Sequence, residues 1–245
     1  TGMGGALGAA AAAKLFVPLQ FWFCCNVGLA LPLIALQYHE VKVILDHDWN
    51  GASNGIGGAG SYSNTLWVDY IYLDTDERRR FAQVSHEYLI EQVQEQDWSP
   101  SNKTLTFNHP VKELIWIKEA GAPTVSNWGP TEPLTSEWQL KLNGHDRFAS
   151  RDFRYFTRVQ VYQHHSGVGG LAAAGTQTFA NFADSIAVYS FALKPEEHQP
   201  SGTCNFSRID NAVLESEDTG TIRVYAVNYN VLRIMSGMGG LAYSN

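Results

Sequence analysis

The chain has 245 residues, of which 17% are charged and 12% aromatic, and it contains 22 glycines. This length is on the high side for one domain and allows a substantial buried core. The formal net charge is −7, with 24 acidic and 17 basic residues. Such a balance argues against a coat that holds nucleic acid directly, because those contacts need lysine and arginine to displace counterions from phosphate.

The N-terminal third has no Asp, Glu, Lys or Arg from Leu15 to His39, a length that could span a bilayer. Proline, glycine and amide residues interrupt it, however, and its apolar residues alternate. We therefore expect no transmembrane segment but a strand buried on both faces, a turn, and a second strand from about Ala35 to Leu45. The adjacent Cys24 and Cys25 are expected as buried thiols at the end of the first strand. With no CxxC pair and no even number of cysteines, the chain indicates a reducing compartment.

Residues 47–64 are rich in Gly, Ser and Asn, which is typical of a flexible linker. The next segment, Leu66–Leu73, alternates as a strand does. Asp74 and Glu77 then have the spacing of a helical capping box, and the arginines 78–80 that follow are expected on the exposed part of this helical turn.

Further strands are predicted by short apolar or alternating runs between turn residues. They are Tyr88–Gln94, Lys103–Phe107, Val111–Lys118, Glu137–Asn143, Ile186–Leu193, Asn205–Glu215 and Thr221–Met235. With Leu66–Leu73 they make eight, the number that a jelly roll of two four-stranded sheets requires. Between the fifth and sixth of the eight, Ser150–His164 has helical periodicity and is expected to pack on the outside of a sheet. Its stripe of Arg151, Arg154 and Arg158 favours a solvated face or a subunit contact over nucleic-acid binding, because three arginines are a small electrostatic footprint.

Catalytic motifs are weak throughout. The glycines at 55, 57 and 60 satisfy GxGxxG, but a strand follows them where a dinucleotide site needs a helix. There is no HxH pair for a cupin-like metal site, and the adjacent His164 and His165 would diverge on an extended chain. Ser236 lacks the first glycine of a nucleophile elbow. We therefore expect no catalytic residue, cofactor or metal.

Two sequons begin at Asn102 and Asn205. Asn102 follows Ser99, Pro100 and Ser101 on a predicted exposed loop and is the candidate glycan acceptor. Asn205 is expected inside a strand and therefore unmodified.

Several long blocks resemble one family in the same order along the chain. They read VPLQFWF and GLALPLIALQYHEVKV (17–43), LWVDYIYLDTDERRRFAQ (66–83), NHPVKELIWI (108–117), EWQLKLNGHDRF (137–148), YSFALKPEEHQPSGTCNFSRID (189–210) and RVYAVNYNVLRIMSGMGGLA (223–242). They are similar to the C-terminal portion of the major capsid protein of the nucleocytoplasmic large DNA viruses, which include chlorella viruses and iridoviruses. The adjacent cysteines after FWF depart from the pattern of this family only locally.

The resemblance implies an all-β chain that carries the second of two tandem jelly rolls. Residues 1–46 would then be the C-terminal remnant of the first jelly roll, contributing its last two strands, 47–64 the linker, and 65–245 the complete second jelly roll with short helices in its loops. On this interpretation the chain begins inside the first jelly roll and is a partial product.

The implied function is structural, without enzymatic activity. The resemblance predicts homotrimeric capsomers of pseudo-hexagonal outline that tile an icosahedral virion shell, assembly in the host cytoplasm, and contacts with neighbouring capsomers and minor capsid proteins. Trp128 and Trp138 are candidate interface anchors, with a place in the core of their own domain equally open. The alternatives are a jelly-roll glycan-binding module on a virion or cell surface and a cupin-type metalloenzyme.

Overall fold

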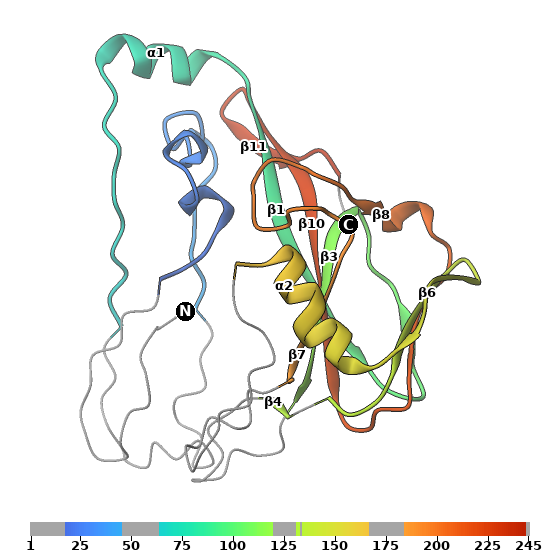
Figure 1. Ribbon diagram of the computed structural model, residues 1–245. Helices are drawn as coiled ribbons and strands as arrows, with labels where there is room; N and C mark the ends of the chain where they lie inside the picture. The colour runs from blue at the N-terminus through green and yellow to red at the C-terminus, as the bar shows by residue number, and fades with distance from the viewer. Residues whose placement is uncertain (1–17, 46–63, 120–130, 133, 167–183, 244–245) are drawn as a thin grey trace, which may run out of the picture. The chain divides into compact units, whose positions relative to one another are not determined.

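The computed structural model describes residues 18–45, 64–119, 131–132, 134–166 and 184–243 (Figure 1). By its contacts the chain divides into two compact units, one of residues 1–90 with 231–244 and the other of residues 91–230 with residue 245. The predicted linker at 47–64 and its glycine motif lie outside the described residues, apart from Asn64. The same is true of Trp128 and of most of residues 119–136 and 167–184.

Two antiparallel sheets make up most of the structure. The first has the order β1 (His86–Trp98), β10 (Ile222–Met235), β3 (Pro110–Glu119), with β4 (Thr131–Glu132), β7 (Ile186–Ser190) and β8 (Cys204–Asn205) also paired with β3, and β11 (Met238–Leu241) paired with β10. The second has the order β2 (Thr104–Leu105), β9 (Ala212–Ser216), β5 (Trp138–Leu142), β6 (His145–Arg151).

The main strands alternate between the two sheets along the chain. β1, β3, β7 and β10 belong to the first sheet, and β2, β5, β6 and β9 to the second, so that among these eight strands only β5 and β6 follow each other within one sheet. Figure 1 shows β1, β10 and β3 running beside one another. Two sheets of four main strands with repeated crossing form a jelly roll, so the predicted fold is confirmed.

An aromatic cluster fills the core between the sheets. The rings of Trp98 and Trp116 lie 5.1 and 5.5 Å from that of Trp138, and all three side chains are almost completely buried. Phe156 continues the cluster 5.2 Å from Trp116. The indole N–H of Trp98 donates to the Leu214 carbonyl at 2.7 Å. Tilted aromatic pairs at these separations add to the free energy gained from burial alone.

Glutamine side chains join β1 to the segment that contains β2. The Gln94 amide donates to the Asn108 carbonyl at 2.7 Å and accepts the Asn108 N–H at 3.0 Å. Gln96 likewise donates to the Thr104 carbonyl at 2.6 Å and accepts the Thr106 N–H at 2.8 Å. Because a side-chain amide carries the same donor and acceptor as a peptide group, these residues link the two sheets where no backbone ladder does.

The prediction of a strand at Leu66–Leu73 is wrong. Its backbone has no ladder partner among the described residues, and most of its side chains are exposed, Trp67 at 84% and Tyr72 at 90%. Alternation marks a strand only where a neighbouring strand supplies hydrogen bonds. The eighth main strand is instead β6, where Phe148 is the one buried residue. The turn before it, Asn143–Gly144, has positive φ at both residues, which is the Asn-Gly hairpin signal that the sequence prediction passed over.

The remaining strand predictions hold in most places. Asn205–Glu215 is divided, because the 3₁₀ turn η5 (Phe206–Arg208) separates β8 from β9. The two strands expected near the N-terminus are absent from the described residues 18–45, which form the 3₁₀ turns η1 (Trp22–Cys24) and η2 (Val27–Leu29) and an extended tail. Cys24 and Cys25 are exposed there, contrary to the prediction, because no strand pairs with this segment to cover it.

Both predicted helices are present. Helix α1 (Thr75–Gln83) has the capping box, with Asp74 accepting from the Thr75 N–H at 2.7 Å and Glu77 accepting from the Asp74 N–H at 3.3 Å. The second consists of the π-helical turn η3 (Tyr155–Val159) and α2 (Gln160–His164). It does not lie only on the outside of a sheet, because Phe156 is fully buried in the aromatic core. The periodicity of the sequence predicted the helix, but it did not predict that Phe156 enters the aromatic core.

Candidate functional surfaces

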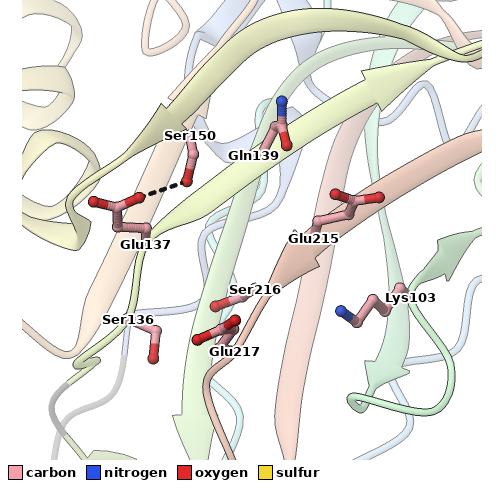
Figure 2. Close-up of a pocket in the computed structure, with 8 residues that line it drawn as sticks. All are labelled: Lys103, Ser136, Glu137, Gln139, Ser150, Glu215, Ser216 and Glu217. Carbon is pink, nitrogen blue, oxygen red and sulfur yellow. Dashed lines mark hydrogen bonds between the residues drawn. The ribbon is translucent and has the colours of Figure 1, made fainter.

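A hollow lies on the second sheet, between the ends of β2, β5, β6 and β9 (Figure 2). Its lining residues are Lys103, Ser136, Glu137, Gln139, Ser150, Glu215, Ser216 and Glu217. The Ser150 hydroxyl donates to Glu137 at 2.8 Å, and Lys141, outside the hollow, pairs with Glu215 at 2.9 Å. The hollow is thus a polar, mainly acidic depression in which Ser150, Glu137 and Glu215 already bond to protein partners.

The chemistry of this hollow supports neither alternative function. None of its described lining residues is aromatic, so it offers no ring for a sugar to stack on. In the part of the chain that the structure describes, no group of three or more His, Cys, Asp or Glu residues could hold a metal ion. No helix among the described residues is long and apolar enough to cross a membrane.

A second polar cluster is buried under residues 193–198, which follow β7. Lys112 on β3, only 3% exposed, pairs with Glu91 at 2.8 Å and donates to the Pro195 carbonyl at 2.6 Å. Its ammonium also lies 5.5 Å from the centre of the Tyr229 ring. Burial, with Glu91 and Glu113 adding to it, raises the pKa of Tyr229 to about 12. Lys112 therefore connects residues 193–198 to β3, because a buried ammonium needs a hydrogen-bond partner for each of its donors.

His165 connects three elements at the end of α2. Its Nε2 lies 3.0 Å from the Glu113 carboxylate on β3, and its Nδ1 lies 3.1 Å from Glu196. The nearby Glu113 carboxylate, helped by Glu196, raises the pKa of His165 although burial opposes it. The preceding His164 bonds instead to the Leu193 carbonyl at 3.1 Å. The two adjacent histidines thus have different partners and do not form a shared metal site.

Buried carboxylates hold loops in place elsewhere. Asp218, 2% exposed, accepts from Lys118 at 3.1 Å and from the Thr135 and Thr219 N–H groups at 3.0 and 3.1 Å. Asp184 accepts from the Arg158 guanidinium, at 2.8 Å from Nε, and from the Thr157 hydroxyl at 2.6 Å. Arg158 therefore lowers the pKa of Asp184, although burial opposes it. These two carboxylates thus connect loops to the rest of the jelly roll and stabilise the fold.

The candidate residues from the sequence fall in different places. Trp138 is fully buried in the core, so of its two open interpretations the structure supports the core and not an interface. Asn102 is exposed in a turn, where its backbone exchanges hydrogen bonds with Ser99. Asn205 ends β8, and its side chain accepts from the Ser207 N–H at 3.1 Å. Sequence reasoning missed the buried Lys112 and His165 clusters, for which no short motif exists.

The fold and these surfaces define a jelly-roll protein whose described buried polar clusters hold loops and strands together. The family model described as large eukaryotic DNA virus major capsid protein matches residues 77–240, and the model described as major capsid protein N-terminus matches residues 5–74. The chain therefore belongs to the major capsid protein family of large eukaryotic DNA viruses. Leu66–Leu73 falls within the match to the N-terminal model.

Relatives and solved structures agree with this family. The chain is 57% identical to the major capsid protein of Pyramimonas orientalis virus, over 94% of this chain and 61% of that protein, and 39% identical to that of Phaeocystis pouchetii virus, over 94% and 65%. A quasi-atomic model of the PBCV-1 virus capsid matches with a TM-score of 0.73 and 40% identity, over 95% of this chain and 71% of that one. The chain thus spans about two thirds of the length of the relatives it matches.

Proposed function

We propose that the chain belongs to a structural subunit of an icosahedral viral capsid. In this proposal the subunit forms homotrimers of pseudo-hexagonal outline, built from two jelly rolls per subunit, and these capsomers tile the outer shell. The observation that carries the proposal is the jelly roll of residues 86–235 inside a chain that belongs to the major capsid protein family.

The division of the chain supports two modules per subunit. Residues 5–74 match the model of the major capsid protein N-terminus, and residues 77–240 match a separate model of the large eukaryotic DNA virus major capsid protein. We infer that residues 1–46 contribute to a first jelly roll, that 47–64 connect the two, and that 65–245 contain the second. Permanent interfaces of such trimers usually bury more than about 2,000 Å² with apolar centres. The exposed Trp67, Tyr70 and Tyr72 are apolar surface of the kind such interfaces cover.

The proposed role is non-catalytic and located in the virion. Subunits would assemble in the host cytoplasm, contact neighbouring capsomers and minor capsid proteins, and enclose the genome without holding it. The net charge of −7 supports the last point. Trp128 remains a candidate interface anchor, and Asn102 remains a candidate glycan acceptor because its side chain is exposed.

The composition of purified virions tests this proposal. Because a shell protein is present in many copies, peptides of this chain should be among the most abundant in virions separated from host debris. They should also stay with the particles after a high-salt wash that removes loosely bound protein. Peptides found only in infected-cell lysate and missing from washed particles would contradict the proposal.

A further inference from the structure

His165, which directly follows α2, lies between two carboxylates from different parts of the fold. Its Nε2 is 3.0 Å from Oε2 of Glu113 on β3, and its Nδ1 is 3.1 Å from Oε1 of Glu196 in the segment after β7. Glu196 also accepts the Ser166 N–H at 3.1 Å. We call these four residues the histidine latch, because they join the end of α2 both to the sheet and to Glu196.

The geometry of the latch suits the protonated imidazole. A neutral imidazole carries one N–H and has an acceptor at its other nitrogen, whereas the imidazolium has a donor at both. A neutral His165 in this place would therefore turn a lone pair toward one of the two carboxylate oxygens. In agreement with this geometry, Glu113 and then Glu196 raise the pKa of His165, although burial opposes them.

The other ionisable side chains around the latch do not replace this charge. Among the described residues, those on the sheet, on α2 and on the segment after β7 are Glu91, Lys112, Tyr229, His164, Lys194, Glu197 and His198. The ammonium of Lys112 is paired with Glu91 at 2.8 Å, and His198 lies 4.0 Å from that same carboxylate. Lys194 pairs with Glu197 at 2.9 Å. Without its second ring proton, His165 would leave two negative carboxylates beside a neutral ring.

Of the two carboxylates, Glu196 is the one that can leave. The Glu113 side chain is 8% exposed, and its Oε2 has no other hydrogen-bond partner among the described residues. The Glu196 side chain is 44% exposed. Because an uncompensated charge is costly to bury, the repulsion is relieved at least cost when the remaining proton faces Glu113 and Glu196 turns into water. The Ser166 N–H then loses its acceptor.

We propose that the histidine latch is a pH-sensitive device that opens when His165 loses one of its two ring protons. Glu196 and Ser166 then separate, while Pro195 stays on Lys112, so that the opening is confined to the end of α2 and the residues facing it. Since the pKa of His165 is raised in the closed state, the latch is closed below the ordinary value of 6.5 and opens as pH rises through the raised one. This device does not depend on the proposed capsid function.

Hydrogen–deuterium exchange of the subunit, expressed from its complete coding sequence, tests the latch at the Ser166 amide. The protection factor is the intrinsic exchange rate at each pH divided by the observed rate. In wild type, this factor should fall about tenfold between about pH 6 and pH 9 at Ser166, while the amides of β3 stay protected because the opening is local.

Two substitutions should act in opposite directions. H165Q offers a donor at only one of the two positions, so Ser166 should exchange rapidly at both pH values. E196Q keeps an oxygen for the Ser166 N–H and gains a donor for the neutral imidazole, so its Ser166 protection should no longer depend on pH. H198Q is the matched control and should behave as wild type.

A wild-type protection factor that is equal at both pH values would overturn the inference. A pH dependence that persists in E196Q, or one that disappears in H198Q, would also overturn it. If H165Q loses protection in β3 as well, that variant is globally unfolded, and E196Q, at its half-exposed position, decides the question. None of these results bears on the proposed capsid function.

Discussion

Tyr38 and Gly237 lie against each other at the turn between β10 and β11. The Tyr38 N–H donates to the Gly237 carbonyl at 3.0 Å, and a Cβ atom on Gly237 would come within 2.6 Å of the Tyr38 ring. Gly237 has φ +81°, and Ser236 before it is also in the left-handed region. Only a residue without a side chain meets both conditions at low cost. His39 adds a bond to this turn by accepting the Gly239 N–H at 3.0 Å.

Replacing Gly237 with alanine should therefore lower the free energy of unfolding. We expect a loss of about 1–3 kcal/mol, from the strained φ and the contact with the Tyr38 ring together. Urea unfolding followed by tryptophan fluorescence measures it. Gly240→Ala is the matched control, because a Cβ there meets no atom within 4 Å and its φ is not positive. Equal losses of unfolding free energy in Gly237→Ala and Gly240→Ala would contradict the conclusion that the position packed against the Tyr38 ring requires glycine.

Asp218→Ala should be among the most destabilising single substitutions in the second sheet region. It removes a 2% exposed carboxylate that satisfies Lys118 and the backbone of residues 135 and 219. Breaking a buried pair in this way costs about 3–5 kcal/mol. Thermal unfolding of the variant measures the effect, and Glu217→Ala, at the exposed neighbouring position, should change stability by less than about 0.5 kcal/mol. A small loss of stability in Asp218→Ala would mean that the loops keep their positions without this carboxylate.

The stability of the jelly roll should fall as pH rises above neutrality. The pKa of His165 is raised above its ordinary value of 6.5 in the folded state, first by Glu113 and then by Glu196. A group that binds its proton more tightly when folded stabilises fully below its unfolded pKa, and this contribution is lost as pH rises through the folded pKa. The transition temperature of wild type should thus decrease from about pH 6.5 upward through this window.

Substitution identifies the group responsible. His165→Gln should remove that part of the pH dependence, whereas His145→Gln, at an exposed position of β6, should keep it. Glu196 acts in the opposite direction: burial acts to raise its pKa, but the bonds from Ser166 and His165 lower it below the ordinary 4.5. Its contribution is therefore present above about pH 4.5 and is lost as pH falls through its lowered folded value. An unchanged slope in His165→Gln would assign the alkaline loss to another group.

Asn102 should carry any N-linked glycan that the virion protein has within this chain. Its side chain is exposed in a turn, whereas the Asn205 side chain accepts the Ser207 N–H. Intact-mass and peptide mass spectrometry of virion protein would show added hexose mass on the peptide with Asn102 and none on that with Asn205. The reverse distribution would contradict the assignment, and Asn102→Gln should abolish the modification.

The sequence predicts the jelly roll better than its details. The class follows from short alternating runs such as 111–118, which pack on a core, and from the long blocks of family resemblance. The strand prediction for Leu66–Leu73 fails because an alternating pattern indicates that both faces of a segment would be buried, but not which neighbouring element would bury them. β6 is missed because only Phe148 faces the core, although Asn143–Gly144 marks its hairpin.

Candidate sites depend on contacts that sequence distance conceals. His165 meets Glu113 and Glu196, and Lys112 meets Glu91, only once the sheet is formed. Trp138 could not be assigned to core or interface from its residue type, since tryptophan is common in both. The arginine stripe was visible in the sequence, but the pairing of Arg158 with Asp184 and the stacking of Arg151 on the Tyr155 ring were not.

Sedimentation equilibrium of the subunit expressed from its complete coding sequence tests the central claim most directly. A capsid subunit that forms pseudo-hexagonal capsomers should sediment at three times the subunit mass at micromolar concentration in near-physiological salt. A single species at the mass of one subunit, under conditions where circular dichroism shows the β-sheet fold intact, would contradict the account.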